Sequence, residues 1–272
     1  MIDLKTKKRI VLILVIAIVV TLFVHVNFLS AQQYTFRHQI IVNESIPKKF
    51  EGFRIALLSD IHLNSLQDVT RLEEIVEDLN AKNADMILFA GDLYEGKVFS
   101  KAEVTALLKS IDSSYGKFAV LGDEDLSHKK TVKSMLKEGG FEVLSNDTRS
   151  IYYNGKKIGL YGMTTDATKL KFSKSFKYSI VLAHYPDQFS FVQKKADLQL
   201  SGHSGGGYIY LPFYGSLVKS EHAEIYNHGT YKTETSTLMV TNGMSCTKAH
   251  HYKLMARNEI LIITLHHSLA TQ

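Results

Sequence analysis

Side chains that can bind metal ions follow five short apolar runs of the sequence, at the point where each run ends. A single aspartate in such a place would mean little, because Asp and Gly are ordinary turn-forming residues. Five such ends are hard to attribute to turns, and in an open α/β sheet the carboxyl ends of the strands meet in one crevice. We therefore expect one cluster of side chains, which contains Asp60 and His62, Asp92, Asp123 with Glu124 and Asp125, His184, and His203.

The candidate side chains are carboxylates and imidazoles, with no thiolate among them. Such ligands suit borderline or hard divalent ions such as Mn²⁺, Zn²⁺ or Fe²⁺. Two ions about 3.5–4 Å apart, bridged by one carboxylate, would clamp the attacking and the leaving oxygen of a phosphoryl group. These residue types therefore indicate hydrolysis of a phosphate ester, with one or two divalent metal ions as cofactors.

His203 lies in the stretch SGHSGGG, where three glycines follow it closely. Taken alone, this stretch would favour a flexible surface turn that carries an incidental histidine. Beside the other four strand ends, His203 instead joins the expected cluster, because it too follows an apolar run. The tyrosines that follow could line a substrate groove, although partly buried strand tyrosines are the commoner case; they are Tyr208, Tyr210 and Tyr214.

The elements that must position these side chains alternate between strands and helices. Short apolar runs predict strands over residues 53–59, 86–90, 117–121, 179–184, 198–203, 238–242 and 259–265. Apolar stripes at helical spacing predict helices over residues 69–80, 101–111 and 131–140. A hairpin is expected over residues 151–162, with its turn at Asn154 and Gly155, and loops are expected over residues 213–236. The alternation predicts an α/β fold with parallel strand pairs and helical crossovers, with no linker that divides residues 50–265.

The N-terminus has the sequence pattern of a membrane anchor. Residues 1–9 include four Lys or Arg, and residues 10–24 contain Thr21 as their only polar member. Extended to residue 30, the segment is long enough to cross a hydrocarbon core of about 30 Å, and the basic residues before it favour a cytoplasmic N-terminus. We expect a single-pass anchor in the cell membrane with the remaining chain extracytoplasmic. The alternative is a cleaved signal peptide, although the apolar run is long for one and LSAQQ is a poor cleavage site.

Charge and cysteine content narrow the range of partners. The single cysteine, Cys246, rules out an intrachain disulfide, so an exported domain would depend on its apolar core. The net charge of +5 is spread through the chain, with no long basic run beyond the N-terminus. An ordinary solvated surface is the first interpretation of this charge, and weak attraction to an anionic membrane surface is the second. No basic stripe is interleaved with aromatic residues, so we expect no nucleic-acid partner. The sequence leaves protein partners unknown.

The strand-end motifs SDIHL, AGDLYEG, LGDED, AHYP and SGHSGGG occur in that order and resemble the five motifs of the calcineurin-like metallophosphoesterases. The resemblance covers roughly residues 53 to 261, and it is closest to the membrane-associated bacterial branch related to UDP-diacylglucosamine pyrophosphohydrolase-like enzymes. It implies an α/β fold, a four-layer αββα sandwich of two mixed sheets, here preceded by one N-terminal transmembrane helix. The expected organisation is a cytoplasmic basic N-terminus (1–9), a transmembrane signal anchor (10–30), a linker and edge strand (31–52), and a metallophosphoesterase domain (53–272).

The resemblance also implies a role for each matching residue. Asp60 and His62 correspond to ligands of a first metal, and Asp92 corresponds to the carboxylate that bridges both metals. The ligands of the second metal correspond to Asp123, His184 and His203. His203 is thereby implied to be a ligand and not an incidental loop residue.

The sequence departs from the family pattern at positions that bear on chemistry. Gly205 stands where the family has the second histidine of Gly-His-x-His, so the first metal lacks one ligand. Asp123 replaces an asparagine, and Glu124 replaces the histidine that assists the leaving group. Glu124 could still donate a proton if burial or neighbouring carboxylates raise its pKa, so we name Glu124 and Asp123 as the catalytic candidates. Glu95, in place of the usual Asp, is a mild change.

Histidines of the C-terminal region could supply the missing ligand, although a lone loop histidine is more often solvated; they are His222, His228, His250 and His251. Two functions are therefore expected. The first is a membrane-anchored, metal-dependent phosphoesterase that hydrolyses a phosphate monoester, diester or pyrophosphate of a small molecule, a lipid or an envelope component. The alternative is a catalytically impaired relative that binds a metal or a phosphorylated ligand without efficient turnover, because losing a general acid costs about 10²–10⁴-fold in rate.

Overall fold

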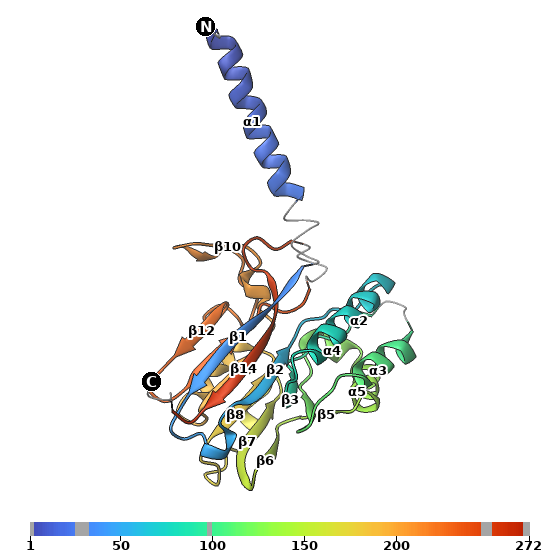
Figure 1. Ribbon diagram of the computed structural model, residues 1–272, viewed down its shortest axis with the longest axis vertical. Coiled ribbons are helices and arrows are strands. Elements are labelled where there is room, and N and C mark those ends of the chain that lie inside the picture. Colours follow the sequence, from blue (N-terminus) through green and yellow to red (C-terminus); the bar gives the residue numbers. More distant parts are fainter. Residues whose placement is uncertain (1–2, 25–32, 97–99, 246–251, 269–272) are drawn as a thin grey trace.

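Two six-stranded mixed sheets form the body of the protein (Figure 1). The computed structural model describes residues 3–24, 33–96, 100–245 and 252–268. In spatial order the first sheet consists of β1 (Tyr34–Val42), β14 (Asn258–His266), β2 (Phe53–Leu58), β3 (Met86–Phe89), β4 (Lys117–Ala119) and β5 (Phe141–Val143). The second consists of β12 (Gly229–Lys232), β13 (Thr237–Val240), β9 (Leu198–Ser201), β8 (Ser179–Ala183), β7 (Lys156–Met163) and β6 (Asp147–Tyr153).

The central strands of both sheets run parallel. In the first sheet β2, β3, β4 and β5 pair in parallel, and in the second β7, β8, β9 and β13 do so. Parallel strands place their carboxyl ends at one edge of a sheet. The loops that leave β2, β3, β4, β8 and β9 at that edge carry the candidate side chains.

The strand β2 shows why two layers pack against each sheet. Its alternate residues Ile55 and Leu57 belong to the core between the two sheets, whereas Ala56 and Leu58 belong to the core beneath the helices. Because side chains of a strand point to opposite faces in turn, a run that is apolar throughout fits only a strand covered on both sides. The apolar run at residues 53–59 is therefore confirmed as a doubly covered strand.

Three helices cover the outer face of the first sheet: α2 (Leu66–Asn80), α3 (Lys101–Lys109) and α5 (Lys129–Glu138) (Figure 1). Serine side chains begin two of them, because Ser65 accepts a hydrogen bond from the Asp68 N–H and Ser100 accepts one from the Glu103 N–H. Gly139 and Gly140 follow the end of α5, and Gly140 has a φ of 85°, the left-handed conformation in which glycine commonly ends a helix.

The outer face of the second sheet has a thinner cover than the expected αββα sandwich. Its apolar core packs under the short helix α6 (Phe189–Val192) and neighbouring 3₁₀ turns η3 (Ala167–Lys169) and η4 (Pro186–Gln188). The connections that precede β8 and β9 lack a long apolar stripe at helical spacing, so they form loops and single turns. The fold thus has two mixed sheets with helices, but long helices flank only one of them in the described residues.

The hairpin expected at residues 151–162 forms between β6 and β7. Asn154 and Gly155 have φ of 47° and 74°, the left-handed conformation that a two-residue hairpin turn needs. Residues 213–236, expected as loops, also contain β12, which pairs with β13. The strand β12 alternates between half-buried and exposed residues of mainly polar type, so its sequence carries no apolar signal.

The N-terminal helix α1 spans Leu4–Val24 and stands apart from the two sheets (Figure 1). Its apolar part from residue 10 to residue 24 would extend about 22 Å, against a hydrocarbon core of about 30 Å. In the described part of the chain, no helix combines the length and the apolar character that crossing a membrane requires. Residues 25–30 of the expected anchor lie outside the described residues.

Candidate metal centre

Two loops at the carboxyl edge of the first sheet bind each other through their backbones. The N–H of Asp60 donates to Gly91 O at 2.9 Å, and the N–H of His62 donates to Asp92 O at 3.0 Å. Asp60, His62 and Asp92 have φ of 55°, 52° and 61°, in the left-handed region that costs a non-glycine residue free energy. This backbone places all three side chains on one buried face, since each is at most 3% exposed.

A buried carboxylate holds the loop that carries Asp92. Asp125 accepts backbone hydrogen bonds from Asp92 (2.8 Å), Leu93 (2.9 Å), Tyr94 (3.3 Å) and Gly122 (3.0 Å). Asp125 is fully buried, so the four N–H groups replace the water that the carboxylate loses. Asp125 is a positioning residue. Although it lies in LGDED, its role was not predicted because the sequence does not say which backbone groups face it.

Replacing Asp125 should therefore destabilise the fold and displace Asp92. Asp125→Ala removes a carboxylate that accepts from four backbone N–H groups, and we expect a loss of about 3 kcal/mol in the free energy of unfolding. Asp125→Asn keeps one acceptor oxygen and should lose about half of that. Urea denaturation of both variants measures the difference, with Asp112→Ala on the exposed surface as control. Equal stability of Asp125→Ala and the parent would show that the clamp contributes nothing.

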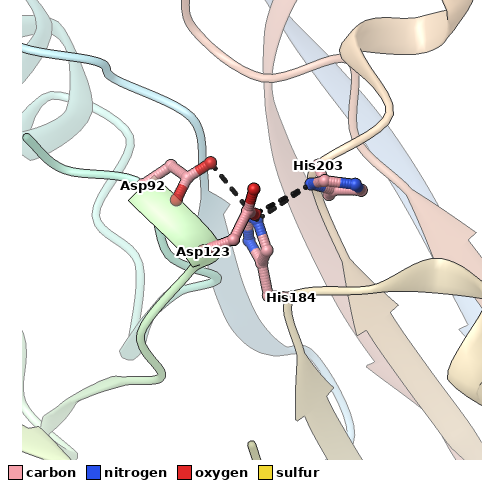
Figure 2. Close-up of side chains that lie close together, drawn as sticks. All are labelled: Asp92, Asp123, His184 and His203. Carbon is pink, nitrogen blue, oxygen red and sulfur yellow. Dashed lines mark hydrogen bonds and ion pairs between the residues drawn. The ribbon is translucent and has the colours of Figure 1, made fainter. Parts of the chain in front are cut away.

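A first group of ligand candidates brings together four residues that follow four different strands, with Asp123 at the start of the short helix α4 (Asp123–Ser127): Asp92, Asp123, His184 and His203 (Figure 2). Their ligand atoms all lie within 4.8 Å of one another. His184 Nε2 lies 2.8 Å from Asp123 Oδ1 and 3.3 Å from Asp92 Oδ2, and His203 Nδ1 lies 3.2 Å from Asp123 Oδ1. The structure thus confirms that these strand ends converge.

The two imidazoles of this group are oriented by backbone carbonyls. His184 Nδ1 lies 2.6 Å from Ala90 O, and His203 Nε2 lies 2.6 Å from Glu221 O. A carbonyl only accepts, so each of these ring nitrogens carries a proton, and in the neutral rings the other nitrogens are acceptors. Those nitrogens, His184 Nε2 and His203 Nδ1, face each other at 3.1 Å beside two carboxylates. When both rings are neutral, these two nitrogens and the carboxylate oxygens are all acceptors, and a cation between them can satisfy them. Metal-binding histidines are commonly oriented in this way, by a partner at the ring nitrogen that faces away from the metal.

A second group consists of Asp60, His62 and Asp92, so Asp92 belongs to both groups. His62 Nε2 lies 3.9 Å from Asp60 Oδ1 and 3.9 Å from Asp92 Oδ2. The other ring nitrogen, Nδ1, lies 3.0 Å from Glu95 Oε1. Glu95 thus orients His62 from behind, a contact that the sequence motif did not reveal.

Glycines allow the backbone to approach these carboxylates closely. A Cβ atom at Gly122 would collide with Asp92 Oδ1, and one at Gly202 would collide with Asp60 Oδ2. His203, which follows Gly202, donates its backbone N–H to both carboxylate oxygens of Asp60 at 3.0 Å. The loop that carries His203 therefore contacts the second group as well as the first.

The charges of the site shift its titrations strongly. Burial disfavours the charged form of His62, but Glu95, Asp92 and Asp60 outweigh it and raise the pKa of His62 to about 9. The pKa of His184 is likewise raised, because Asp92 and Asp123 outweigh burial. Burial would raise the pKa of Asp123, but His184 and His203 hold that pKa well below its usual range. In the metal-free site, His62 and His184 thus hold a second proton at pH values where a free imidazole would be neutral.

These shifts predict how the metal-free protein responds to pH. The folded pKa of His62 lies above its unfolded value of 6.5, so protonation stabilises the metal-free fold below pH 6.5, and this stabilisation is lost as pH rises toward 9. Thermal unfolding after chelation should show a lower Tm at pH 9 than at pH 6.5. Protein reloaded with Mn²⁺ should lose less, because metal binding requires the same protons to leave. A Tm that rises with pH after chelation would contradict the assignment.

The space beside Gly205 is occupied by an aromatic ring. A Cβ atom at Gly205 would lie 2.6 Å from Cζ of Tyr208, and Tyr208 is 3% exposed. A histidine at position 205 would thus require the tyrosine to move. Of the tyrosines that could line a groove, Tyr208 is packed into the fold, Tyr210 is half-buried and Tyr214 is exposed.

The expected replacements for the missing histidine do not join either ligand group in the described residues. His222 packs against Tyr185 with ring centroids 4.4 Å apart and the ring planes tilted by 36°, and His228 stacks on Tyr210 at 4.1 Å. His250 and His251 lie outside the described residues. Tyr185 is a site neighbour that the sequence did not predict, because its ring also packs edge-on against His203 at 4.7 Å.

Glu124 lies at the rim of the site and is partly exposed. Its backbone N–H donates to Asp92 Oδ1 at 3.1 Å. Burial raises the pKa of its carboxyl, and the charges of Asp92, Glu95 and Asp123 raise it further. Of the two carboxylates that flank Glu124 in the sequence, Asp123 acts on its pKa together with Asp92 and Glu95. Asp125 instead binds backbone N–H groups inside the protein.

The sequence model of the calcineurin-like phosphoesterases matches residues 53–207. That stretch is more than half of the chain and contains all six ligand candidates. The chain belongs to this family. Calcineurin-like phosphoesterases are phosphoric ester hydrolases that use divalent metals, and the two Asp/His groups of this chain could hold such ions.

Relatives among known proteins carry related names. An uncharacterized metallophosphoesterase of Bacillus subtilis, YkuE, is 28% identical over 89% of this chain and 88% of its own length. A zebrafish transmembrane protein with a metallophosphoesterase domain is 26% identical over 80% of this chain and 57% of its own length. The UDP-2,3-diacylglucosamine pyrophosphatase LpxG of Chlamydia muridarum is 36% identical over 29% of this chain and 26% of its own length.

Proposed function

We propose that this calcineurin-like phosphoesterase is a membrane-anchored hydrolase of a phosphate diester or pyrophosphate in a lipid or envelope component. The observation that supports it most directly is the sharing of Asp92 between two ligand groups. A carboxylate common to two cation sites is what hydrolysis with two metal ions requires. We infer that Asp60, His62 and Asp92 hold one ion, and that Asp92, Asp123, His184 and His203 hold the other.

Divalent ions at these groups would neutralise the charge that develops on the phosphoryl oxygens. The chain itself orients the ligands, since Ala90 O, Glu221 O and the Glu95 carboxylate each bind the outer nitrogen of one histidine. Glu124 would hold the proton for the departing oxygen, because its pKa is raised and it lies at the exposed rim. Asp123 would serve as a ligand and direct the approach of substrate.

The membrane part of the proposal rests on the N-terminal sequence. Residues 10–30 are apolar apart from Thr21, His25, Asn27 and Ser30, and four basic residues precede them. We infer a cytoplasmic N-terminus and an extracytoplasmic hydrolase domain. The zebrafish relative is named a transmembrane protein and the Chlamydia relative a pyrophosphatase of UDP-2,3-diacylglucosamine, which favours the same setting and a lipid substrate here.

Turnover by the full chain in bilayer vesicles tests the chemical part. Metal-stripped protein should gain activity when Mn²⁺, Zn²⁺ or Fe²⁺ is added, and a monoester, a diester and a pyrophosphate offered in parallel identify the scissile bond. Metal retention without turnover of any of these substrates would overturn the proposal. Protease digestion of intact cells tests the placement of the domain, since an extracytoplasmic domain is cut without permeabilisation.

A second candidate function follows from the packing at Gly205. Because the ring of Tyr208 fills the place where a histidine ligand would stand, the group of Asp60, His62 and Asp92 offers three side chains among the residues that the structure describes. Losing one ligand costs on the order of 10–100-fold in metal affinity or activity. A protein that binds one metal and a phosphorylated ligand without efficient turnover is therefore the alternative, which the same assay with metal analysis identifies.

A further inference from the structure

An aromatic hairpin projects from the domain next to the candidate metal centre. The strands β10 (Tyr210–Leu211) and β11 (Gly215–Ser216) pair with each other and form a separate two-stranded sheet. Between them Phe213 is fully exposed and Tyr214 is 77% exposed. A large apolar side chain held entirely in water by a hairpin has no packing role in the fold.

The hairpin is part of a larger uncharged surface. The stretch from residue 204 to residue 218 contains no Asp, Glu, Lys or Arg. Leu217, which directly follows the hairpin, is 49% exposed, and Met255 is 57% exposed. Met255 lies beside the hairpin, because Ile209 forms bridges with Leu254 and Met255. Phe213, Tyr214, Leu217 and Met255 thus form one exposed surface, here called the apolar tip.

The apolar tip lies at the end of the domain where the chain arrives from α1. Asn258, three residues after Met255, pairs with Tyr34 at the start of β1. Figure 1 shows β10 at the same end of the sheets as this start and as α1. Residues 25–33 connect α1 to Tyr34, and the ten Cα–Cα steps from Val24 to Tyr34 can span at most about 36 Å, so a bilayer that held α1 would lie near the tip.

We propose that the apolar tip inserts into the headgroup region of the lipid bilayer and thereby holds the metal centre against the membrane surface. This inference rests on the anchorage proposed above. Aromatic side chains at a membrane interface combine an apolar body with tolerance for the polar headgroups. The stretch from residue 204 to residue 218 brings no charge into that region, and the exposed Lys219 and Arg257 border it. A binding partner made of protein would also cover apolar side chains, but the adjacency of the tip to the chain that leaves α1 favours lipid.

The tip is continuous with the metal centre through short connections. The N–H of Leu217 donates to Ile209 O at 2.8 Å, and four residues later Glu221 O binds His203 Nε2 at 2.6 Å. The insertion would therefore place the loop that orients His203 at the bilayer surface. A lipid phosphate at headgroup depth could reach the ligand groups without leaving the membrane.

A single tryptophan can report the insertion, because the chain contains none. Phe213→Trp in the full chain, reconstituted in vesicles with nitroxide-labelled headgroups, should show blue-shifted emission that the nitroxide quenches. The matched control is Tyr152→Trp, a site 63% exposed that pairs with Lys157 beside the β6–β7 turn. Figure 1 shows β6 at the opposite end of the sheets from β10. The control should stay water-exposed and should not be quenched by the labelled lipid.

The outcomes separate this inference from the proposed function. If the Phe213→Trp variant binds vesicles but its emission matches that of the control and is quenched only by aqueous acrylamide, the insertion is wrong, while anchorage and hydrolysis stand. Blue-shifted emission without quenching by labelled lipid would contradict the insertion in favour of a protein partner. Protein that does not float with vesicles would overturn both the insertion and the proposed anchorage.

Turnover gives a second readout with a variant outside the metal centre. Phe213→Ser combined with Leu217→Ser removes exposed apolar area without disturbing a packed core. We expect the rate on a phosphodiester presented in vesicles to fall about tenfold, equivalent to about 1.4 kcal/mol, and the rate on a soluble phosphodiester to stay unchanged. If the rate fell equally on both substrates, Phe213 and Leu217 would support the fold or the metal centre, and the proposed membrane contact would be wrong.

Discussion

Asp92→Ala is expected to abolish metal-dependent hydrolysis and to release metal from both ligand groups. Asp92 is the residue that the two groups share, and His62 Nε2 and His184 Nε2 lie 3.9 Å and 3.3 Å from its Oδ2. Without it, the remaining candidates divide into two incomplete sets. Bound metal ions contribute several kcal/mol by stabilising charge in the transition state. Losing about 4 kcal/mol of this stabilisation corresponds to a fall of about 10³-fold in rate.

Metal analysis of the purified variant, together with hydrolysis of bis(p-nitrophenyl) phosphate, measures both effects. Asp112→Ala, on the exposed surface, is the matched control and should retain metal and activity. Asp92→Asn should be intermediate in metal content, because the amide oxygen can still bind one ion. An Asp92→Ala variant that keeps two equivalents of metal and its full rate would disprove the role of Asp92 as the shared ligand.

Glu124→Gln is expected to lower turnover of substrates with poor leaving groups by about 10²–10⁴-fold. A glutamine cannot donate the proton that an alkoxide leaving group needs. p-Nitrophenolate leaves without a proton, so hydrolysis of p-nitrophenyl esters should fall far less. The comparison of an alkyl with a p-nitrophenyl diester therefore distinguishes lost acid catalysis from damage to the site.

The dependence of the hydrolysis rate on pH is a second test of Glu124 as the proton donor. Burial and the charges of Asp92, Glu95 and Asp123 raise the pKa of Glu124, so an acid-catalysed rate should decline as pH rises through that pKa, and Glu124→Gln should lose this decline. Glu103→Gln on α3 is the control, because it makes the same chemical change outside the site. Equal losses on both esters, with an unchanged profile, would remove Glu124 from the role of proton donor.

Much of the fold follows from the sequence because its central strands are buried on both faces. Such strands are continuously apolar, and the runs at 53–59 and 86–90 correspond to β2 and β3 within one or two residues. Strands at the sheet edges lack this signal. Thus β12, with alternately exposed polar residues, gave no pattern, and β5 is a three-residue strand that periodicity cannot identify.

The candidate site was predictable as a set of residues, but its supporting contacts were not. Strand ends converge in any parallel sheet, so the six ligand candidates could be grouped from their order alone. The clamp by Asp125 and the packing of Tyr208 over Gly205 depend on the path of the backbone at left-handed residues. No spacing rule in a single sequence specifies such contacts, because they depend on how the loops turn in space.

The left-handed backbone at Asp60, His62, Asp92 and His203 sets thermostability against activity. Each non-glycine residue in that conformation costs about 1–3 kcal/mol, more than the roughly 0.4–1 kcal/mol that a glycine adds through the unfolded chain. Glycine at one of these positions would relieve the backbone, but it would also remove a side chain that the chemistry needs, together with its contacts, such as those that Asp60 accepts from the His203 N–H. Strain and ligand therefore occur as a pair at each position, and relieving the backbone costs the protein a ligand.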